Sequence, residues 1–168
     1  MSNIKKLCFA GILTALAVVC SAFYIPLGAS KCLPVQHMVN VIAGVLLGPG
    51  YAVGMAFTTS LIRVMLGTGS LLAFPGSMVG ALFCGLLYKY TQRLSAAYIG
   101  EVFGTGVIGA LLAFPVAALV MGKETALFAY LLPFLISSFG GATISVVVLT
   151  ALEKTGVFGS IRIALGQK

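Results

Sequence analysis

The sequence predicts an all-α integral membrane protein: one domain over residues 1–168, folded as a bundle of six transmembrane helices with both termini cytoplasmic. The chain is 60% hydrophobic and 8% charged, whereas soluble domains carry about 25% charged residues. Its mean hydropathy is +1.14, and it contains uncharged stretches of about the 20 residues that cross a bilayer. Its basic residues stand mainly at the ends of those stretches. These three observations predict the fold class, and each helix follows from the pattern along the chain.

The first uncharged stretch predicts a helix over residues 5–27. Lys5 and Lys6 precede the apolar run, an arrangement that is also typical of signal peptides. The run is long, however, and the residues before Cys20 make a poor lipobox. We therefore expect a helix that is retained in the membrane.

The second uncharged stretch, residues 32–62, is too long for one span. Gly48-Pro49-Gly50 divides it, because proline interrupts a helix and glycine permits a tight reversal. The pattern predicts helices over residues 35–47 and 51–66, of which the first is shorter than a usual span.

The second half of the chain predicts three further helices and a tail. A helix over residues 75–90 follows a loop of small residues, and Pro75 suits its first turn. Helices are also predicted over residues 95–120 and 125–152, each with an internal proline that favours a kink. Residues 153–168 are predicted to form a basic cytoplasmic tail.

The loop charges set the orientation of these six helices. With the N-terminus inside, seven basic residues fall on the inner side and two on the outer side, a positive-inside bias. The inner residues are Lys5, Lys6, Lys89, Arg93, Lys154, Arg162 and Lys168, and the outer ones are Lys31 and Lys123.

Composition also excludes several function classes. The net charge is +7, but the basic residues form no patch with interleaved aromatics, so nucleic-acid binding is not expected. Four cysteines without a CxxC pair and a single histidine give neither a disulfide framework nor a zinc site. No Walker A loop and no hydrolase motif occurs. We expect a protein that is not an enzyme and holds no cofactor.

Small residues recur at a spacing of four along several predicted helices. Gly11 and Ala15 lie on the first helix, and Gly76/Gly80 and Gly100/Gly104 on the fourth and fifth. Such faces let helix backbones approach closely in lipid. They favour internal packing or, for Gly11 and Ala15, docking of a partner protein.

A polar cluster stands at the outer start of the second helix. Offsets of three and four place Gln36 and His37 on the same face as Asn40. An amide and an imidazole each donate and accept hydrogen bonds, which suits a neutral heteroaromatic ligand. The alternative is a wetted cluster at the membrane interface.

Two ionisable residues lie inside apolar stretches, where an ion costs roughly 2.5–3.5 kcal/mol on insertion scales. Arg63 either extends to the outer headgroups or faces the bundle. Glu101 has a short side chain, so we expect it to point inward, paired with Arg63 or in contact with the substrate. Other candidates for a binding site are aromatic and hydroxyl residues of the outer helix halves, namely Phe74, Ser77, Tyr130 and Ser137.

Three segments resemble a known family. Residues 34–49 (PVQHMVNVIAGVLLGP) resemble the second helix of substrate-binding S components of energy-coupling-factor vitamin transporters. Residues 66–77 (LGTGSLLAFPGS) and 100–110 (GEVFGTGVIGA) make the resemblance specific for ThiW-type proteins. It covers about residues 5–153.

The resemblance implies six helices, a ligand site on the outer side, and a multi-pass protein of the cell membrane. It also implies partners: a transmembrane T subunit and two cytoplasmic ATPase subunits, which use the ATP. ThiW-type members are assigned to the thiazole moiety of thiamine, 4-methyl-5-(2-hydroxyethyl)thiazole. The family's first helix carries an Ala-x-x-x-Ala docking motif, for which this chain has Gly11-x-x-x-Ala15.

The predicted function is therefore high-affinity capture of a thiamine precursor, with roles assigned as hypotheses. Gln36, His37 or Asn40 would contact one end of the thiazole, while Glu101 would accept a hydrogen bond from its hydroxyl and Arg63 would fix the carboxylate. Two alternatives stay open. One is an S component for an acidic or phosphorylated precursor held by Arg63, and the other is a membrane assembly protein without transport.

Overall fold

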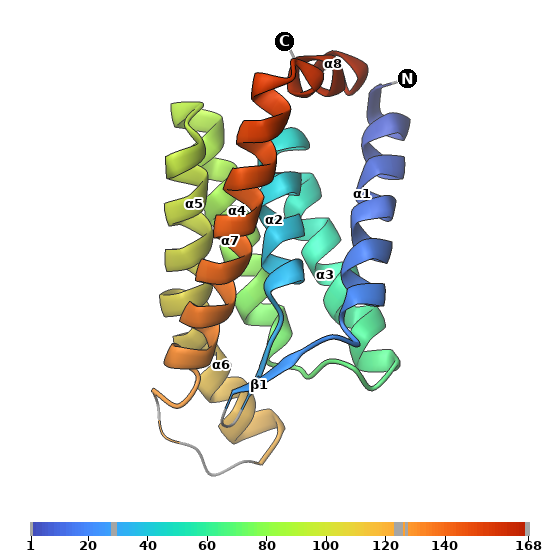
Figure 1. Cartoon of the computed structure of the whole chain (residues 1–168). Coiled ribbons are helices and arrows are strands. Elements are labelled where there is room, and N and C mark those ends of the chain that lie inside the picture. Colours follow the sequence, from blue (N-terminus) through green and yellow to red (C-terminus); the bar gives the residue numbers. More distant parts are fainter. Residues whose placement is uncertain (1, 28–29, 123–125, 127, 167–168) are drawn as a thin grey trace.

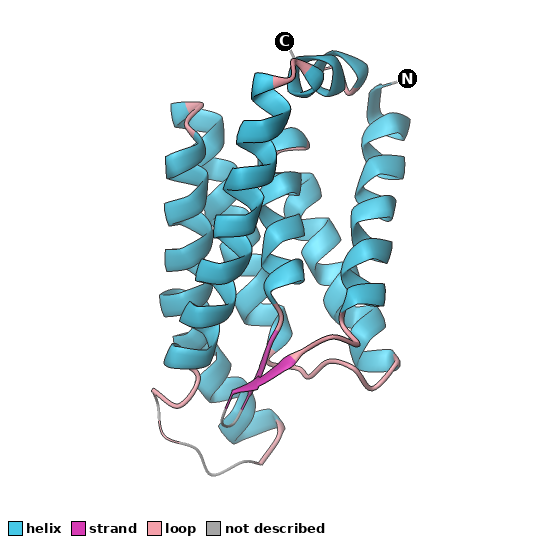
Figure 2. Ribbon diagram, viewed as in Figure 1, coloured by secondary structure: helices cyan, strands magenta, loops and turns pink. Residues whose placement is uncertain are grey.

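The computed structural model describes residues 2–27, 30–122, 126 and 128–166. Long helices run side by side along one bundle axis, and a two-stranded hairpin and loops gather at one end (Figures 1 and 2). A short helix, α8, lies across the opposite end, where α1 also begins (Figure 1). The predicted all-α class is confirmed for these residues.

The N-terminal helix is shorter than its sequence predicts. α1 spans Ser2–Cys20, and the chain then forms β1 (Ile25–Leu27), which pairs antiparallel with β2 (Ser30–Cys32). The prediction of helix up to residue 27 is wrong. Pro26 lacks the N–H that a helix interior needs, and the residue before a proline favours extended backbone. The hairpin places this segment across the end of the bundle.

The second and third helices meet at a sharp reversal. α2 spans Pro34–Leu46 and α3 spans Pro49–Met65. Gly48 between them has φ +88°, a backbone conformation that glycine adopts at little cost, and Pro49 stands in the first turn of α3. α2 is the central helix, because it packs on α3, α4 and α7.

The fourth helix and the long run that follows it lie against each other. α4 spans Ala73–Thr91. The run comprises α5 (Leu94–Phe103), the π-helical η1 (Gly104–Gly109), α6 (Ala110–Pro115) and the π-helical η2 (Val116–Val120). Single π-helical turns inside α-helices are frequent at functional sites.

The C-terminal part also differs from prediction. α7 spans Leu131–Lys154, and turn residues precede it, so the predicted helix begins later than residue 125, which itself lies outside the described residues. The predicted tail over residues 153–168 contains α8, Val157–Ala164. Phe158 and Leu165 of this segment are buried, because apolar side chains at helical spacing let it pack on the end of α7.

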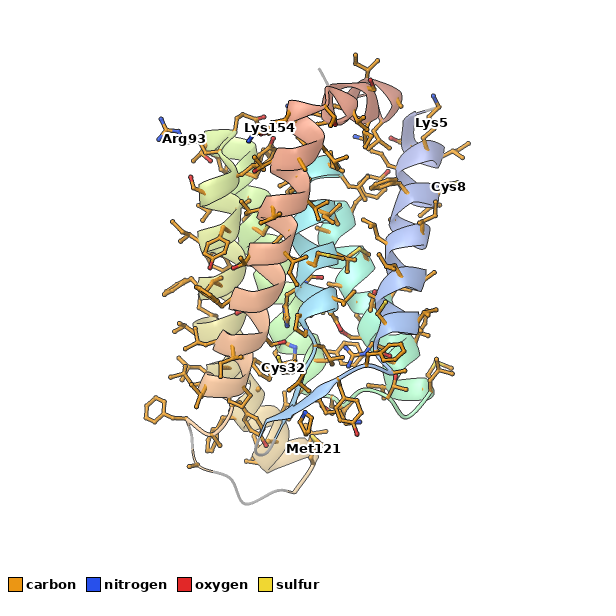
Figure 3. The ribbon with its side chains drawn as sticks, viewed as in Figure 1. Lys5, Cys8, Cys32, Arg93, Met121 and Lys154 are labelled. Carbon is orange, nitrogen blue, oxygen red and sulfur yellow. The ribbon has the colours of Figure 1, made fainter. Side chains whose placement is uncertain are left out.

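Three of the described helical runs are long and apolar enough to cross a membrane: Asn3–Cys20, Leu94–Val120 and Leu131–Lys154. α2, α3 and α4 lie within the same bundle (Figure 1). Lys5, Arg93 and Lys154 stand at the end where α1 begins, and Cys32 and Met121 toward the other end (Figure 3). Lys123 and Lys168, which entered the charge count, lie outside the described residues.

Candidate ligand-binding site

A cavity of about 420 Å³ opens near the hairpin end of the bundle. The hairpin, α2, α3, α4, η1 and α7 all contribute to its wall. Cations, hydroxyls and aromatic rings share this lining, a combination typical of sites for small polar aromatic molecules. The lining residues are Tyr24, Pro26, Lys31, Leu33, Gln36, His37, Arg63, Gly69, Ser70, Leu72, Ala73, Gly76, Ser77, Thr105, Phe134 and Ser137.

The first turns of α2 place three polar side chains inside the bundle. Pro34 stands in the first turn of α2, and the backbone N–H of Leu33 just before it donates to the Ser137 hydroxyl at 2.8 Å. Gln36, His37 and Asn40 are 3%, 8% and 0% exposed. These side chains are therefore buried in the described structure, and Gln36 and His37 also line the cavity.

Gln36 forms one set of hydrogen bonds with side chains of α3 and α4. We call this set, which comprises Gln36, Ser60, Arg63 and Ser77, the Gln36 branch. The Gln36 amide Nε2 donates to the Ser77 hydroxyl at 3.0 Å and reaches the Ser60 hydroxyl at 3.5 Å. Its carbonyl Oε1 accepts a hydrogen bond from the Arg63 guanidinium. The branch thus joins α2, α3 and α4 beneath the cavity.

Arg63 is the only cation in this branch, and it does not extend to the headgroups, since its side chain is buried at 2% exposure. A guanidinium carries five N–H donors, yet one hydrogen bond to Gln36 is the only one found for it among the described residues, and Nε has no partner there. No carboxylate of the described chain pairs with it. Arg63 therefore presents an uncompensated positive charge in the cavity wall.

A second set of hydrogen bonds leaves His37 and Asn40, and we call His37, Asn40, Glu101 and Thr105 the His37 branch. His37 Nδ1 lies 2.8 Å from Glu101 Oε1, and Asn40 Nδ2 donates to the same oxygen at 3.1 Å. The Thr105 hydroxyl lies 3.2 Å from that oxygen and 3.1 Å from the carbonyl oxygen of Gly76. Glu101 is 0% exposed. The donors from α2 and η1 all reach its Oε1, while Oε2 is buried without a partner among the described residues.

Glycine at position 80 makes room for the Glu101 carboxyl. A Cβ at Gly80 would lie 3.0 Å from the carboxyl carbon of Glu101 and would overlap the Thr105 hydroxyl. The backbones of α4 and η1 thus approach closely around Gly80 and Gly104, whose added Cβ would lie 3.0 Å from the Cα of Gly80. The Gly76/Gly80 and Gly100/Gly104 spacing serves internal packing.

The comparison with protein families decides the identity of this chain. Residues 7–155 match the sequence model of the family described as thiamine-precursor transporter protein (ThiW). The chain belongs to the ThiW family. The resemblance to ThiW-type proteins is confirmed, and with it the membrane-transporter class. No curated protein and no solved structure matches the chain.

Of the nine ligand-contacting candidates in this ThiW-family chain, five line the cavity: Gln36, His37, Arg63, Ser77 and Ser137. The other four are absent from its lining: Asn40, Phe74, Glu101 and Tyr130. Asn40 and Glu101 lie behind His37 in the His37 branch. The Phe74 ring packs on Phe57 at 5.5 Å, and the Tyr130 ring packs on the lining residue Phe134 at 6.2 Å.

Sequence reasoning left open whether Arg63 pairs with Glu101. In the described structure they belong to different branches, and the partner of Glu101 is His37. The hypothesis that Arg63 fixes the Glu101 carboxylate is therefore wrong.

Several site residues escaped the sequence analysis of this ThiW-family chain. Thr105 follows Glu101 by four residues and Ser60 precedes Arg63 by three, so helical spacing could have found both. Tyr24 and Lys31 line the cavity from the hairpin, and the Lys31 ammonium lies 4.3 Å from the centre of the Tyr24 ring. Their positions depend on how the hairpin folds over the bundle, for which the sequence carries no local signal.

The docking candidates lie far from the cavity lining, on α1. Gly11 and Ala15 are exposed, and a Cβ added to Gly11 would meet nothing within 4 Å. The opposite face of α1 is buried through Ala10, Leu13 and Ala17, because α1 packs on α2 and α3. The small residues of α1 therefore face outward, unlike those of α4 and α5.

Proposed function

We propose that this ThiW-family chain captures 4-methyl-5-(2-hydroxyethyl)thiazole outside the cell and delivers it for ATP-driven uptake with a shared energy-coupling module. The observation that carries the proposal is the cavity of about 420 Å³. Its volume lies at the lower end of the roughly 300–1,000 Å³ of small-molecule pockets. A single substituted heteroaromatic ring fits within such a space.

The chemistry of the cavity wall suits the groups of this thiazole. The ring nitrogen is an acceptor, and Arg63 has guanidinium N–H groups without partners. The hydroxyl both donates and accepts, and His37 and Ser77 line the same space. Tyr24 and Phe134 supply aromatic faces for the ring.

Six membrane spans with cytoplasmic termini are part of the proposal. The spans are α1, α2, α3, α4, the run from α5 to η2, and α7. The placement of Lys5, Arg93 and Lys154 at one end of the bundle (Figure 3) supports a cytoplasmic location for that end under the positive-inside rule. The cavity, near the hairpin end, would then open to the outside.

Coupling to a transmembrane T subunit and two cytoplasmic ATPase subunits is the second part. The exposed small residues Gly11 and Ala15 support it, since small residues permit close helix contacts in lipid. The double variant Gly11→Leu/Ala15→Leu tests it. We expect unchanged thiazole binding by the purified protein and loss of thiazole uptake by cells that carry the coupling subunits. Unchanged uptake would refute this docking face.

Calorimetry tests the ligand. The purified protein in lipid nanodiscs is titrated with hydroxyethylthiazole, then with thiamine and with the pyrimidine precursor. We expect tight binding of the thiazole alone. Arg63→Met should weaken it roughly 100-fold, whereas Thr58→Ala, an exposed site on the same helix, should not. If none of the three compounds binds, the ligand assignment is refuted, and the alternative of a membrane assembly protein is favoured.

A second candidate is the phosphate ester of the same thiazole. The uncompensated charge of Arg63 and the ammonium of Lys31 in one cavity wall favour it. Titration with the ester against the alcohol separates the two candidates, because only one of them should saturate the site at low concentration.

A further inference from the structure

We infer that Glu101 is a positioning residue that holds His37 as the neutral tautomer protonated at Nδ1, so that the lone pair of Nε2 faces the cavity. This lone pair would accept a hydrogen bond from the ligand, which makes the site selective for a heteroaromatic alcohol. The ligand part rests on the proposed function, whereas the state of the ring is a property of the protein alone.

The orientation of the Asn40 amide is the first step. One end of this amide lies 3.3 Å from the carbonyl oxygen of Ser77 and 3.1 Å from Glu101 Oε1. A backbone carbonyl only accepts, so the atom that faces it is the amide nitrogen. Its second hydrogen then points to Glu101 Oε1, which must accept.

The same oxygen fixes the proton on the imidazole. His37 Nδ1 lies 2.8 Å from Glu101 Oε1. An Oε1 without a proton can only accept, whether or not Oε2 carries one, so we assign the donor role to Nδ1. A partner of one ring nitrogen sets the role of the other, so Nε2 becomes the acceptor of a neutral ring.

Two cations share the cavity wall with His37, namely Arg63 from α3 and Lys31 from β2. The other charged groups of the described helices that pack on α2, such as Lys5 and Lys154, stand at the far end of the bundle (Figure 3). A neutral His37 would give this wall an acceptor, whereas a doubly protonated ring would only donate.

An acceptor at this place decides which ligand fits. Arg63 and Lys31 only donate. The hydroxyls of Ser77 and Ser137 both donate and accept, and they already accept from Gln36 and Leu33. A ligand hydroxyl can donate to His37 Nε2, whereas a methyl ether or a fully ionised phosphate ester has no proton for it. The cavity should therefore prefer the alcohol to its methyl ether by roughly ten-fold, the value of one hydrogen bond to a buried group.

The ring state can be read directly, because His37 is the single histidine of the chain. Protein labelled with ¹⁵N-histidine and purified through a tag without histidine gives one imidazole signal pair. We expect a protonated Nδ1 and an unprotonated Nε2 in the ligand-free wild type, assigned by couplings to the ring protons. A protonated Nε2, alone or together with Nδ1, would overturn the inference without any variant.

Two variants separate positioning from mere packing. Glu101→Met removes the acceptor at similar side-chain length and should move the proton from Nδ1 to Nε2. Glu101→Gln keeps a carbonyl oxygen and should keep the wild-type pattern. An unchanged pattern in Glu101→Met, or its loss in Glu101→Gln, would contradict the assignment.

Ligand selectivity completes the test. Wild type and Glu101→Gln should prefer hydroxyethylthiazole over its methyl ether by roughly ten-fold, and Glu101→Met should lose that preference. Equal affinity of the wild type for both compounds would refute the acceptor role of His37. If neither compound binds, the proposed function fails, while the ¹⁵N spectrum still decides the tautomer.

Discussion

The Gln36 branch and the His37 branch begin one residue apart on α2 and end on ions of opposite sign. Arg63 in the Gln36 branch lines the cavity and has no carboxylate partner in the described structure. Glu101 in the His37 branch lies behind the cavity lining and takes hydrogen bonds from His37 and Asn40. Arg63 is therefore available to a ligand, whereas Glu101 makes its hydrogen bonds within the protein.

This difference assigns different tasks to the two branches. A buried charge without a partner lowers the stability of the empty protein, and a ligand that satisfies it regains that free energy on binding. A carboxyl group that lies behind the cavity lining and already takes hydrogen bonds from the protein contributes little to a ligand directly but fixes the groups around it. Changes in the Gln36 branch should mainly alter affinity, and changes in the His37 branch should mainly alter folding and selectivity.

The largest expected effect comes from crowding the His37 branch. Gly80→Ala places a Cβ against the Thr105 hydroxyl and the Glu101 carboxyl. We expect a loss of about 3 kcal/mol in unfolding free energy, the upper end of overpacking costs. Chemical unfolding in mixed micelles measures it.

Gly54→Ala on α3 is the matched control. A Cβ there would meet nothing within 4 Å, and alanine is the better helix former by about 1 kcal/mol. The two substitutions should therefore have opposite signs. A stable Gly80→Ala protein would show that the close contact of α4 with α5 is not needed.

Breaking the Gln36 branch at its cation should separate affinity from stability. Arg63→Met removes charged hydrogen bonds to the ligand, and we expect roughly 100-fold weaker binding. The unfolding free energy of the empty protein should change by no more than about 1 kcal/mol, because relief of an unpaired charge offsets the lost bond to Gln36. Calorimetry and unfolding of the same sample measure both. Normal affinity with a large loss of stability would reverse the assignment of Arg63.

A smaller effect is expected where the Gln36 branch ends on a hydroxyl. Ser77→Ala removes the acceptor of Gln36 Nε2 and should cost about 1 kcal/mol in unfolding free energy. Ser145→Ala on α7 is the control, because its hydroxyl is buried without a partner among the described residues. Removal of such a group should stabilise the protein. A Ser77→Ala protein as stable as the wild type, or more stable, would mean that the serine bond to Gln36 contributes nothing.

The sequence predicted the members of these branches better than their connections. Helical spacing placed Gln36, His37 and Asn40 on one face, and the scarcity of charge marked Arg63 and Glu101. Which of them meet depends on the relative rotation and depth of α3, α4 and α5, which no local pattern records. The predicted contact of Glu101 with Arg63 was wrong for this reason. Glu101 contacts His37 instead.

The spacing of small residues likewise predicted close helix–helix contacts but not which helix each face would contact. Gly80 of α4 and Gly104 of η1 meet each other, whereas Gly11 and Ala15 with the same spacing are exposed on α1. The difference arises because α1 buries its other face, and only the assembled bundle reveals this. The hairpin was missed for a related reason: its strands have three residues each, too few for an alternating pattern to be read.

The smallest effect is expected at Lys31, at the cavity rim. It tests whether the Gln36 branch binds a neutral or a negatively charged ligand. Lys31 is exposed on β2 and its ammonium lies over the Tyr24 ring, so water and salt screen most of its charge. Lys31→Met should leave the affinity for the neutral thiazole within roughly two-fold and weaken the phosphate ester by only a few-fold, mostly through slower association. Stopped-flow binding at low and high salt measures this. A loss larger than that of Arg63→Met would place the main cation of the site on the hairpin, and the contrast between the two branches would then have to be drawn between Lys31 and Glu101.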